Sequence, residues 1–162
     1  MEPIALALWL VLYIICIYTD MKWHRIKNIA TFPTAGFGLV LIVWRYGLRA
    51  SAFFVLTVFV AGFITELFKI WGSGDTKLFI SASLLSAVLV GAANPYFVLY
   101  FLEFNIVLYL AVGHTYTFYK SGFKPVLYIA NLRTGGEIGK IPGALPIAIS
   151  NIAAMVLYFA LR

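Results

Sequence analysis

Long apolar stretches that carry almost no charge dominate this chain. The first covers residues 3–19, and five more follow at about 29–44, 50–68, 78–93, 96–119 and 141–161. An α-helix needs roughly 17 to 25 apolar residues to cross the hydrocarbon core of a bilayer. The composition agrees, because 63% hydrophobic and 11% charged residues lie far outside the usage of soluble domains. We therefore expect an all-α integral membrane protein with six transmembrane helices in a single domain, 1–162.

Features near the amino terminus indicate that the first stretch stays in the protein. It follows Glu2 without the positive region or the small-residue cleavage site of a secretory signal peptide. The single cysteine, Cys16, lies inside this stretch, which excludes an intrachain disulfide and a multi-cysteine metal site. The net charge of +6 comes from basic residues in short loops rather than on one polar surface. The expected environment is a lipid bilayer, and no nucleic-acid partner is expected.

The distribution of basic residues predicts the orientation. Six spans place both termini on the same side of the membrane, and alternation assigns nine of the twelve basic residues to the opposite side. Cytoplasmic loops carry the excess of Lys and Arg in membrane proteins. Both termini are therefore expected outside the cell, in a multi-pass protein of the cytoplasmic membrane. The same alternation puts Asp20 and Asp75 at the cytoplasmic face.

Asp75 ends the segment Gly72-Ser73-Gly74-Asp75, where a polar turn meets the fourth apolar stretch. A carboxyl group at this position lies at the membrane edge, where it stays accessible to water. The flanking glycines remove side-chain bulk, so an extended peptide has room to approach the acid. The same four residues are also typical of an ordinary flexible turn. A catalytic interpretation therefore needs a second acid, and Asp20 is predicted at the same depth.

Two carboxyl groups at one depth are able to hydrolyse a peptide bond. The ionised one takes a proton from water while the protonated one donates to the carbonyl under attack. Like charges that lie close together share one proton and titrate in coupled steps. Cys16 is in the middle of a span, and His24 and His114 lack an evident metal partner. The predicted catalytic residues are Asp20 and Asp75, with no cofactor and no metal ion.

Three short motifs carry a family resemblance that extends over the whole chain. They are Asp20 followed by Arg25-Ile26-Lys27-Asn28, then Gly72-Ser73-Gly74-Asp75-Thr76-Lys77-Leu78, then Lys140-Ile141-Pro142-Gly143-Ala144-Leu145-Pro146. This pattern resembles the type IV prepilin peptidases and the archaeal preflagellin peptidases, which are membrane aspartic peptidases with a Gly-x-Gly-Asp motif. Lys27 stands where the family usually has proline, and Pro142-Gly143-Ala144-Leu145-Pro146 stands where it usually has Pro-Phe-Gly-Pro. Asp20 and Asp75 match the two catalytic aspartates of the family.

The resemblance implies a substrate and a reaction. The expected activity is cleavage of the leader peptide (class III signal peptide) of pilin-like or archaellin-like precursors, just before their hydrophobic segment and at the cytoplasmic membrane face. Bifunctional bacterial members also methylate the new amino terminus, and they carry a cytoplasmic domain with paired Cys-x-x-Cys motifs. With one cysteine, this chain resembles the peptidase-only form, without methyltransferase activity.

Two other functions stay open on the sequence. A small ion-coupled transporter or channel would use Glu103, Asp75 and His114 as a polar path through the bilayer. A presenilin-like intramembrane protease also has a Gly-x-Gly-Asp acid, but its first acid is expected inside a span after a tyrosine. Here Asp20 follows Tyr18-Thr19 at the end of a span, which favours the prepilin peptidase interpretation.

The predicted orientation is tested with tags. Because nine of the twelve basic residues fall on one side, a tag at either terminus should be accessible to a membrane-impermeant label on intact cells. Labelling of either tag only after the membrane is opened would contradict the six-span arrangement and would separate Asp20 from Asp75.

Overall fold

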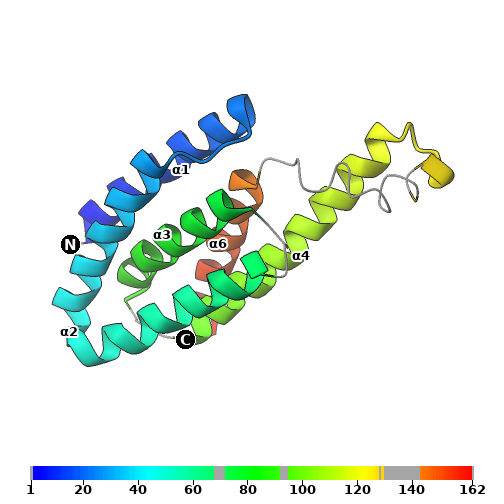
Figure 1. Cartoon of the computed structure of the whole chain (residues 1–162). Coiled ribbons are helices and arrows are strands. Elements are labelled where there is room, and N and C mark those ends of the chain that lie inside the picture. Colours follow the sequence, from blue (N-terminus) through cyan, green and yellow to red (C-terminus); the bar gives the residue numbers. More distant parts are fainter. Residues whose placement is uncertain (1, 68–71, 92–94, 128, 130–142, 162) are drawn as a thin grey trace.

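The computed structural model describes residues 2–67, 72–91, 95–127, 129 and 143–161. These residues are almost entirely helical and include no β-strand. The helices are α1 (Glu2–Trp23), α2 (Asn28–Leu67), α3 (Ser73–Leu89), α4 (Pro95–Lys120) and α6 (Ala144–Ala160) (Figure 1). The all-α prediction is confirmed for this part of the chain. Residues 68, 92–93 and 141–142 of the predicted spans, and most of the connection between the last two spans, lie outside the described residues.

Helix α2 contains a sharp bend that divides it into a first arm (28–46) and a second arm (48–67). The bend is at Gly47, whose φ of 77° and ψ of 164° suit glycine far better than any other residue. The Ser51 hydroxyl stabilises the bend by donating to the carbonyls of Ile42 (3.1 Å) and Gly47 (2.6 Å). The two arms correspond to the apolar stretches at 29–44 and 50–68, and they diverge from the bend in Figure 1.

Two helices, α1 and α2, are long and apolar enough to cross a membrane. Large apolar side chains are also exposed along α1, both arms of α2, α4 and α6. Ile29, Trp44 and Leu48, for example, are 80%, 74% and 74% exposed. Soluble monomers rarely show apolar surface of this extent. Length, composition and surface together indicate a membrane environment.

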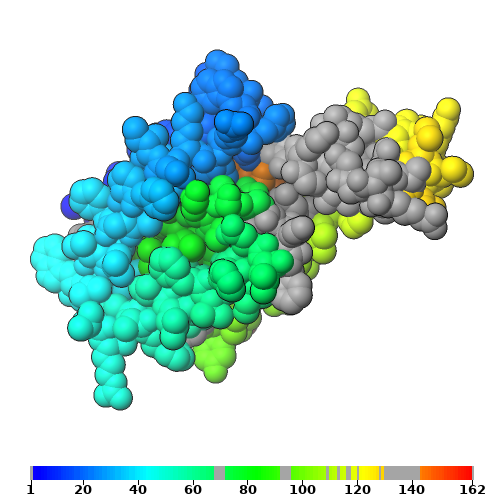
Figure 2. All heavy atoms as spheres, viewed as in Figure 1, coloured from blue at the N-terminus to red at the C-terminus, as the bar shows by residue number. Residues whose placement is uncertain are grey.

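The core forms around α3, which contacts α1, α2, α4 and α6. In Figure 2 only part of α3 (green) is visible between α1 with the first arm of α2 (blue and cyan) and the second arm (teal). Small side chains allow this close packing, and Ser81, Ser83 and Ser86 are all buried. A Cβ added to Gly38 of α2 would lie only 2.9 Å from the Cβ of Leu84. The first arm of α2 therefore contacts α3 with almost no space between them.

A buried polar cluster holds α1, α3 and α6 together. The Trp9 indole N–H donates to Ser86 Oγ (3.1 Å) and to Asn151 Oδ1 (3.0 Å), and the Ser86 hydroxyl donates to the same Asn151 oxygen (2.7 Å). A hydrogen bond in an apolar interior avoids the cost of an unpaired polar group. The cluster therefore favours one register among the three helices.

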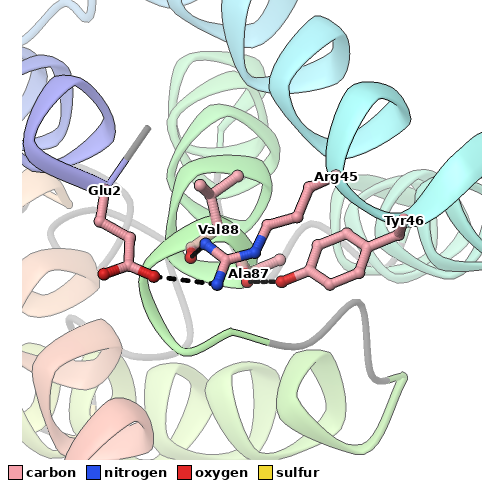
Figure 3. Close-up of polar contacts among 5 residues, drawn as sticks. All are labelled: Glu2, Arg45, Tyr46, Ala87 and Val88. Atoms are coloured by element: carbon pink, nitrogen blue, oxygen red, sulfur yellow. Dashed lines mark hydrogen bonds and ion pairs between the residues drawn. The ribbon is translucent and has the colours of Figure 1, made fainter.

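Arg45 and Tyr46 join the bend of α2 to the carboxyl end of α3 (Figure 3). Arg45 Nη1 donates to the Val88 carbonyl (2.9 Å), Arg45 Nη2 pairs with Glu2 Oε1 (2.9 Å), and the Tyr46 hydroxyl donates to the Ala87 carbonyl (3.1 Å). The last carbonyls of a helix have no partner within the helix, and cations near them are favourable. These contacts anchor the end of α3 that is farthest from Asp75.

We expect Arg45→Gln to lower stability more than Arg49→Gln does. Arg45 loses its bond to Val88, worth about 1 kcal/mol, and an ion pair with the exposed Glu2 that contributes little. Arg49 is exposed and serves as the matched control. Thermal unfolding of the two variants in the same detergent measures the difference, and equal melting temperatures would show that the α3 anchor is unimportant.

Candidate active site

Asp20 lies in the last turn of α1 and is 6% exposed. Its Oδ2 accepts a hydrogen bond of 2.9 Å from the backbone N–H of Ala144, at the start of α6. The first span was expected to end at residue 19, at the start of a polar segment, but the helix α1 continues to Trp23. A helix does not have to end where its apolar residues end. Helix α1 ends at Trp23, and the next residue, His24, has a left-handed φ of 51°.

Asp75 lies in the first turn of α3 and is partly buried. The segment 72–75 was expected to form a turn ahead of a span that starts at Leu78, but α3 already begins at Ser73. Gly72 is the N-cap residue, and its N–H donates to Asp75 Oδ2 (3.2 Å). An acidic side chain at the third helical position caps the helix and interacts favourably with the helix dipole. Asp75 thus stabilises the helix start that carries it.

The loop between α1 and α2 packs against the start of α3. A Cβ added to Gly74 would lie 3.3 Å from the Cβ of Ile26, which is a tight contact. Beside it, the Lys77 ammonium donates to Asn28 Oδ1 (3.0 Å). The missing side chain of Gly74 thus makes room for the protein's own loop, whereas the sequence predicted that it would make room for a bound peptide.

The start of α6 brings the two acids to the same end of the helix bundle. Ala144 donates to Asp20, and Gly143 lies directly against the carboxyl group of Asp75. A Cβ added to Gly143 would lie 2.6 Å from Cγ and 2.8 Å from Oδ2 of Asp75. The expectation that Asp20 and Asp75 share one end of the molecule therefore agrees with the described structure.

The surroundings of the two acids favour different protonation states. Burial raises the pKa of Asp75 to about 7, the negative charge of Asp20 adds to the rise, and the Gly72 hydrogen bond opposes it. Burial also raises the pKa of Asp20, but the backbone N–H groups of Ala144 and Gly143 and the nearby His24 oppose this rise and favour its ionised form. Near neutral pH the site therefore offers one carboxylate and one carboxylic acid, which is the combination that general acid–base chemistry needs.

The other candidate residues do not gather at this site. Glu66, Glu103 and His114 have exposed side chains near the end of α2 and on α4, and Cys16 is a buried free thiol in α1. The described residues contain no group of three or more His, Cys, Asp or Glu side chains arranged to hold a metal ion.

A cavity of about 770 Å³ borders the site. It is lined by Trp23, Arg25, Ile26, Lys27, Asn28 and Ile29, so it lies along the loop that contacts Gly74. Sequence reasoning missed this cavity and the contacts of Gly143 and Ala144. The only signal for those contacts was the Pro-Gly-Ala segment that opens the last apolar stretch.

Comparison with known proteins gives no match: no family model fits the chain, and no curated protein or solved structure is significantly similar to it. The function is therefore inferred from the geometry of the site together with the short sequence motifs.

The raised pKa of Asp75 predicts how stability changes with pH. A carboxyl group whose pKa rises on folding binds more protons in the folded than in the unfolded state, between about pH 4 and pH 7. Its contribution to stability is therefore lost as pH rises through this range. Asp75→Asn should raise the melting temperature at pH 8 and have little effect at pH 4. Glu103→Gln, on an exposed carboxyl group, is the control, and equal effects of the two variants at pH 8 would contradict the prediction.

Proposed function

We propose that this protein is a membrane aspartic endopeptidase that removes the leader peptide of pilin-like or archaellin-like precursors. One observation carries the proposal. Asp20 and Asp75 come from separate motifs on α1 and α3, and both contact the first residues of α6, which belong to the third motif. Three motifs that meet around two carboxyl groups are more readily explained by a catalytic site than by packing alone.

In the proposed mechanism Asp20 acts first as the base. Its carboxylate takes a proton from a water molecule as the water oxygen attacks the carbonyl carbon of the scissile peptide bond. Asp75 donates its proton to the carbonyl oxygen, which gives a neutral tetrahedral diol. Asp20 then passes its proton to the leaving nitrogen, Asp75 recovers the proton from the diol, and the C–N bond breaks. The residues end in their starting protonation states, and no cofactor takes part.

The proposed setting is a six-span protein with both termini outside the cell and the acids at the cytoplasmic face. The helix arrangement supports it, because α1 ends and α6 begins next to the acids, while Glu2 pairs with Arg45 beside the carboxyl end of α3. Arg25, Lys27 and Lys77 belong to the acid-bearing end, as the positive-inside rule requires of a cytoplasmic face.

The cavity beside the site is the proposed place for the leader. Its lining combines Arg25 and Lys27 with Ile26 and Ile29, so it offers polar and apolar contacts to an extended chain. The hydrophobic segment of the precursor would then pack on the apolar surface of the helices while its leader stays in the cytoplasm. This arrangement puts the junction of the two segments, where cleavage is expected, at the depth of the acids.

Replacement of either acid should abolish cleavage. Asp20→Asn and Asp75→Asn keep side-chain size but remove the ionisable group, and we expect each to reduce kcat by about 100- to 10,000-fold. The double variant should lose little more, since either acid alone lacks its partner. The measurement is the size shift of a precursor with a class III leader, incubated with detergent-solubilised protein.

Glu103→Gln is the matched control for this experiment, because it removes an exposed carboxyl group on α4. It should cleave at the parental rate. Full activity in Asp20→Asn or in Asp75→Asn would remove that residue from the catalytic role.

A further inference from the structure

The start of α6 contacts both acids through two adjacent residues. Ala144 is fully buried and donates its backbone N–H to Asp20 Oδ2 at 2.9 Å. Gly143 lies against Asp75, and the three atoms nearest to an added Cβ would be the two carboxyl oxygens and Cγ of that residue. The acids are 55 residues apart in sequence (75 − 20), yet two consecutive residues at the start of α6 contact both.

We propose that Gly143 is a positioning residue for the acid pair: its missing side chain lets Asp75 lie against the peptide unit whose next amide holds Asp20. The effect on cleavage rests on the proposed function, whereas the effect on the geometry of the two acids does not.

Space, and not backbone conformation, is what requires glycine at this position. Gly143 has φ of −75° and ψ of −22°, which are ordinary helical values for any residue. A Cβ there would nevertheless lie 2.6 Å from Cγ of Asp75, a distance that real Cβ atoms essentially never show. The same addition at Gly36 would meet nothing within 4 Å. An alanine at position 143 would therefore fit the backbone conformation of the helix but would overlap with the side chain of Asp75.

Relief of this overlap would separate the acids in either of two ways. If Asp75 moves, it leaves the neighbourhood of Asp20 directly. If the start of α6 moves instead, the amide of Ala144 withdraws from Asp20, because the two residues are consecutive. Both movements weaken the arrangement that gives the acids different protonation states.

The charged and polar groups around the pair predict a measurable result. Burial and the charge of Asp20 raise the pKa of Asp75, and the Gly72 N–H, which donates to Asp75, opposes the rise. On the other acid, His24 and the N–H groups of Gly143 and Ala144 lower the pKa of Asp20. Lys77 instead bonds to Asn28. Separation from Asp20, together with greater contact with water, would therefore lower the pKa of Asp75 toward the ordinary value of aspartate.

The titration can be observed without a substrate, because the chain contains only two aspartates, Asp20 and Asp75. Protein labelled with ¹³C at the aspartate side-chain carboxyl gives two NMR signals, which Asp75→Asn assigns. In Gly143→Ala the titration midpoint of Asp75 should fall by about one pH unit or more. Gly36→Ala should leave it unchanged. Gly38→Ala, which overlaps with Leu84 in the α2 and α3 contact, shows what a packing defect elsewhere does.

A double-mutant cycle tests the same contact through stability. Asp75→Ala removes all three atoms that the new Cβ would meet. Gly143→Ala should therefore lower the melting temperature in the parent chain and much less in the Asp75→Ala background. This comparison still works if Gly143→Ala alone folds poorly.

Cleavage gives the third readout. Gly143→Ala should reduce kcat by about 100-fold with a small change in KM, and the high-pH limb of its pH profile should move to lower pH. An unchanged Asp75 midpoint in Gly143→Ala, an equal shift in Gly38→Ala, or an equal loss of stability in both backgrounds would each overturn the positioning role. If the parent cleaves no precursor while the midpoint shifts as expected, the proposed function fails and the positioning role stands.

Discussion

The hydrogen bond between the Ala144 amide and the Asp20 carboxylate joins residues that are 124 positions apart in the chain. A carboxylate with so little exposure is costly unless a donor compensates for the water it has lost. This requirement constrains the first and last helices, because the start of α6 must lie at the end of α1. The Trp9, Ser86 and Asn151 cluster makes a second polar connection within the core. With both in place, α1 and α6 have little freedom to slide relative to α3, and the amino end of α3 carries the second acid.

Opposing effects act on Asp75 at the start of α3. Its position in the first turn of α3 is favourable, since it caps the Gly72 amide and faces the positive end of the helix dipole. Burial and the nearby charge of Asp20 act in the opposite direction and raise its pKa to about 7. A packing role alone would be served by asparagine, which caps helices without a charge. Under the proposed function the carboxyl group serves proton transfer, and the small-residue packing of α3 against α2 provides stability that offsets its cost.

The apolar stretches predicted the helices well, because segments that are buried in hydrocarbon or in a protein core must consist largely of apolar residues. The polar break around Arg45 to Arg49 located the bend, and Gly47 provides it. The apolar stretches misplaced two helix ends: α1 continues past Asp20 to Trp23, and α3 begins at Ser73, before the expected start of the span at residue 78. Apolar composition shows where apolar residues stop and not where backbone hydrogen bonds stop. Alternation of spans placed both acids at one end. The Pro142-Gly143-Ala144 segment was the only local signal for the contacts of Gly143 and Ala144, and it could not specify them, because the close approach at Gly143 and the interhelical hydrogen bond of Ala144 exist only once three helices have packed.

The contact with α6 changes how the proposed site would work. On the sequence alone, the two acids belong to different loops joined through two intervening spans, and nothing forces them into contact before a substrate binds. In the structure Asp75 and Asp20 both lie against residues 143–144, and Gly74 contacts Ile26. Because contacts among the helices hold the two acids, the proposed mechanism does not need substrate binding energy to bring them together. In the proposed mechanism, the binding energy of the substrate would instead position the scissile bond at the acids. The substrate would approach along the loop that lines the cavity. Selectivity for a precursor would accordingly reside in residues 23–29, and reactivity in the contact among α1, α3 and α6.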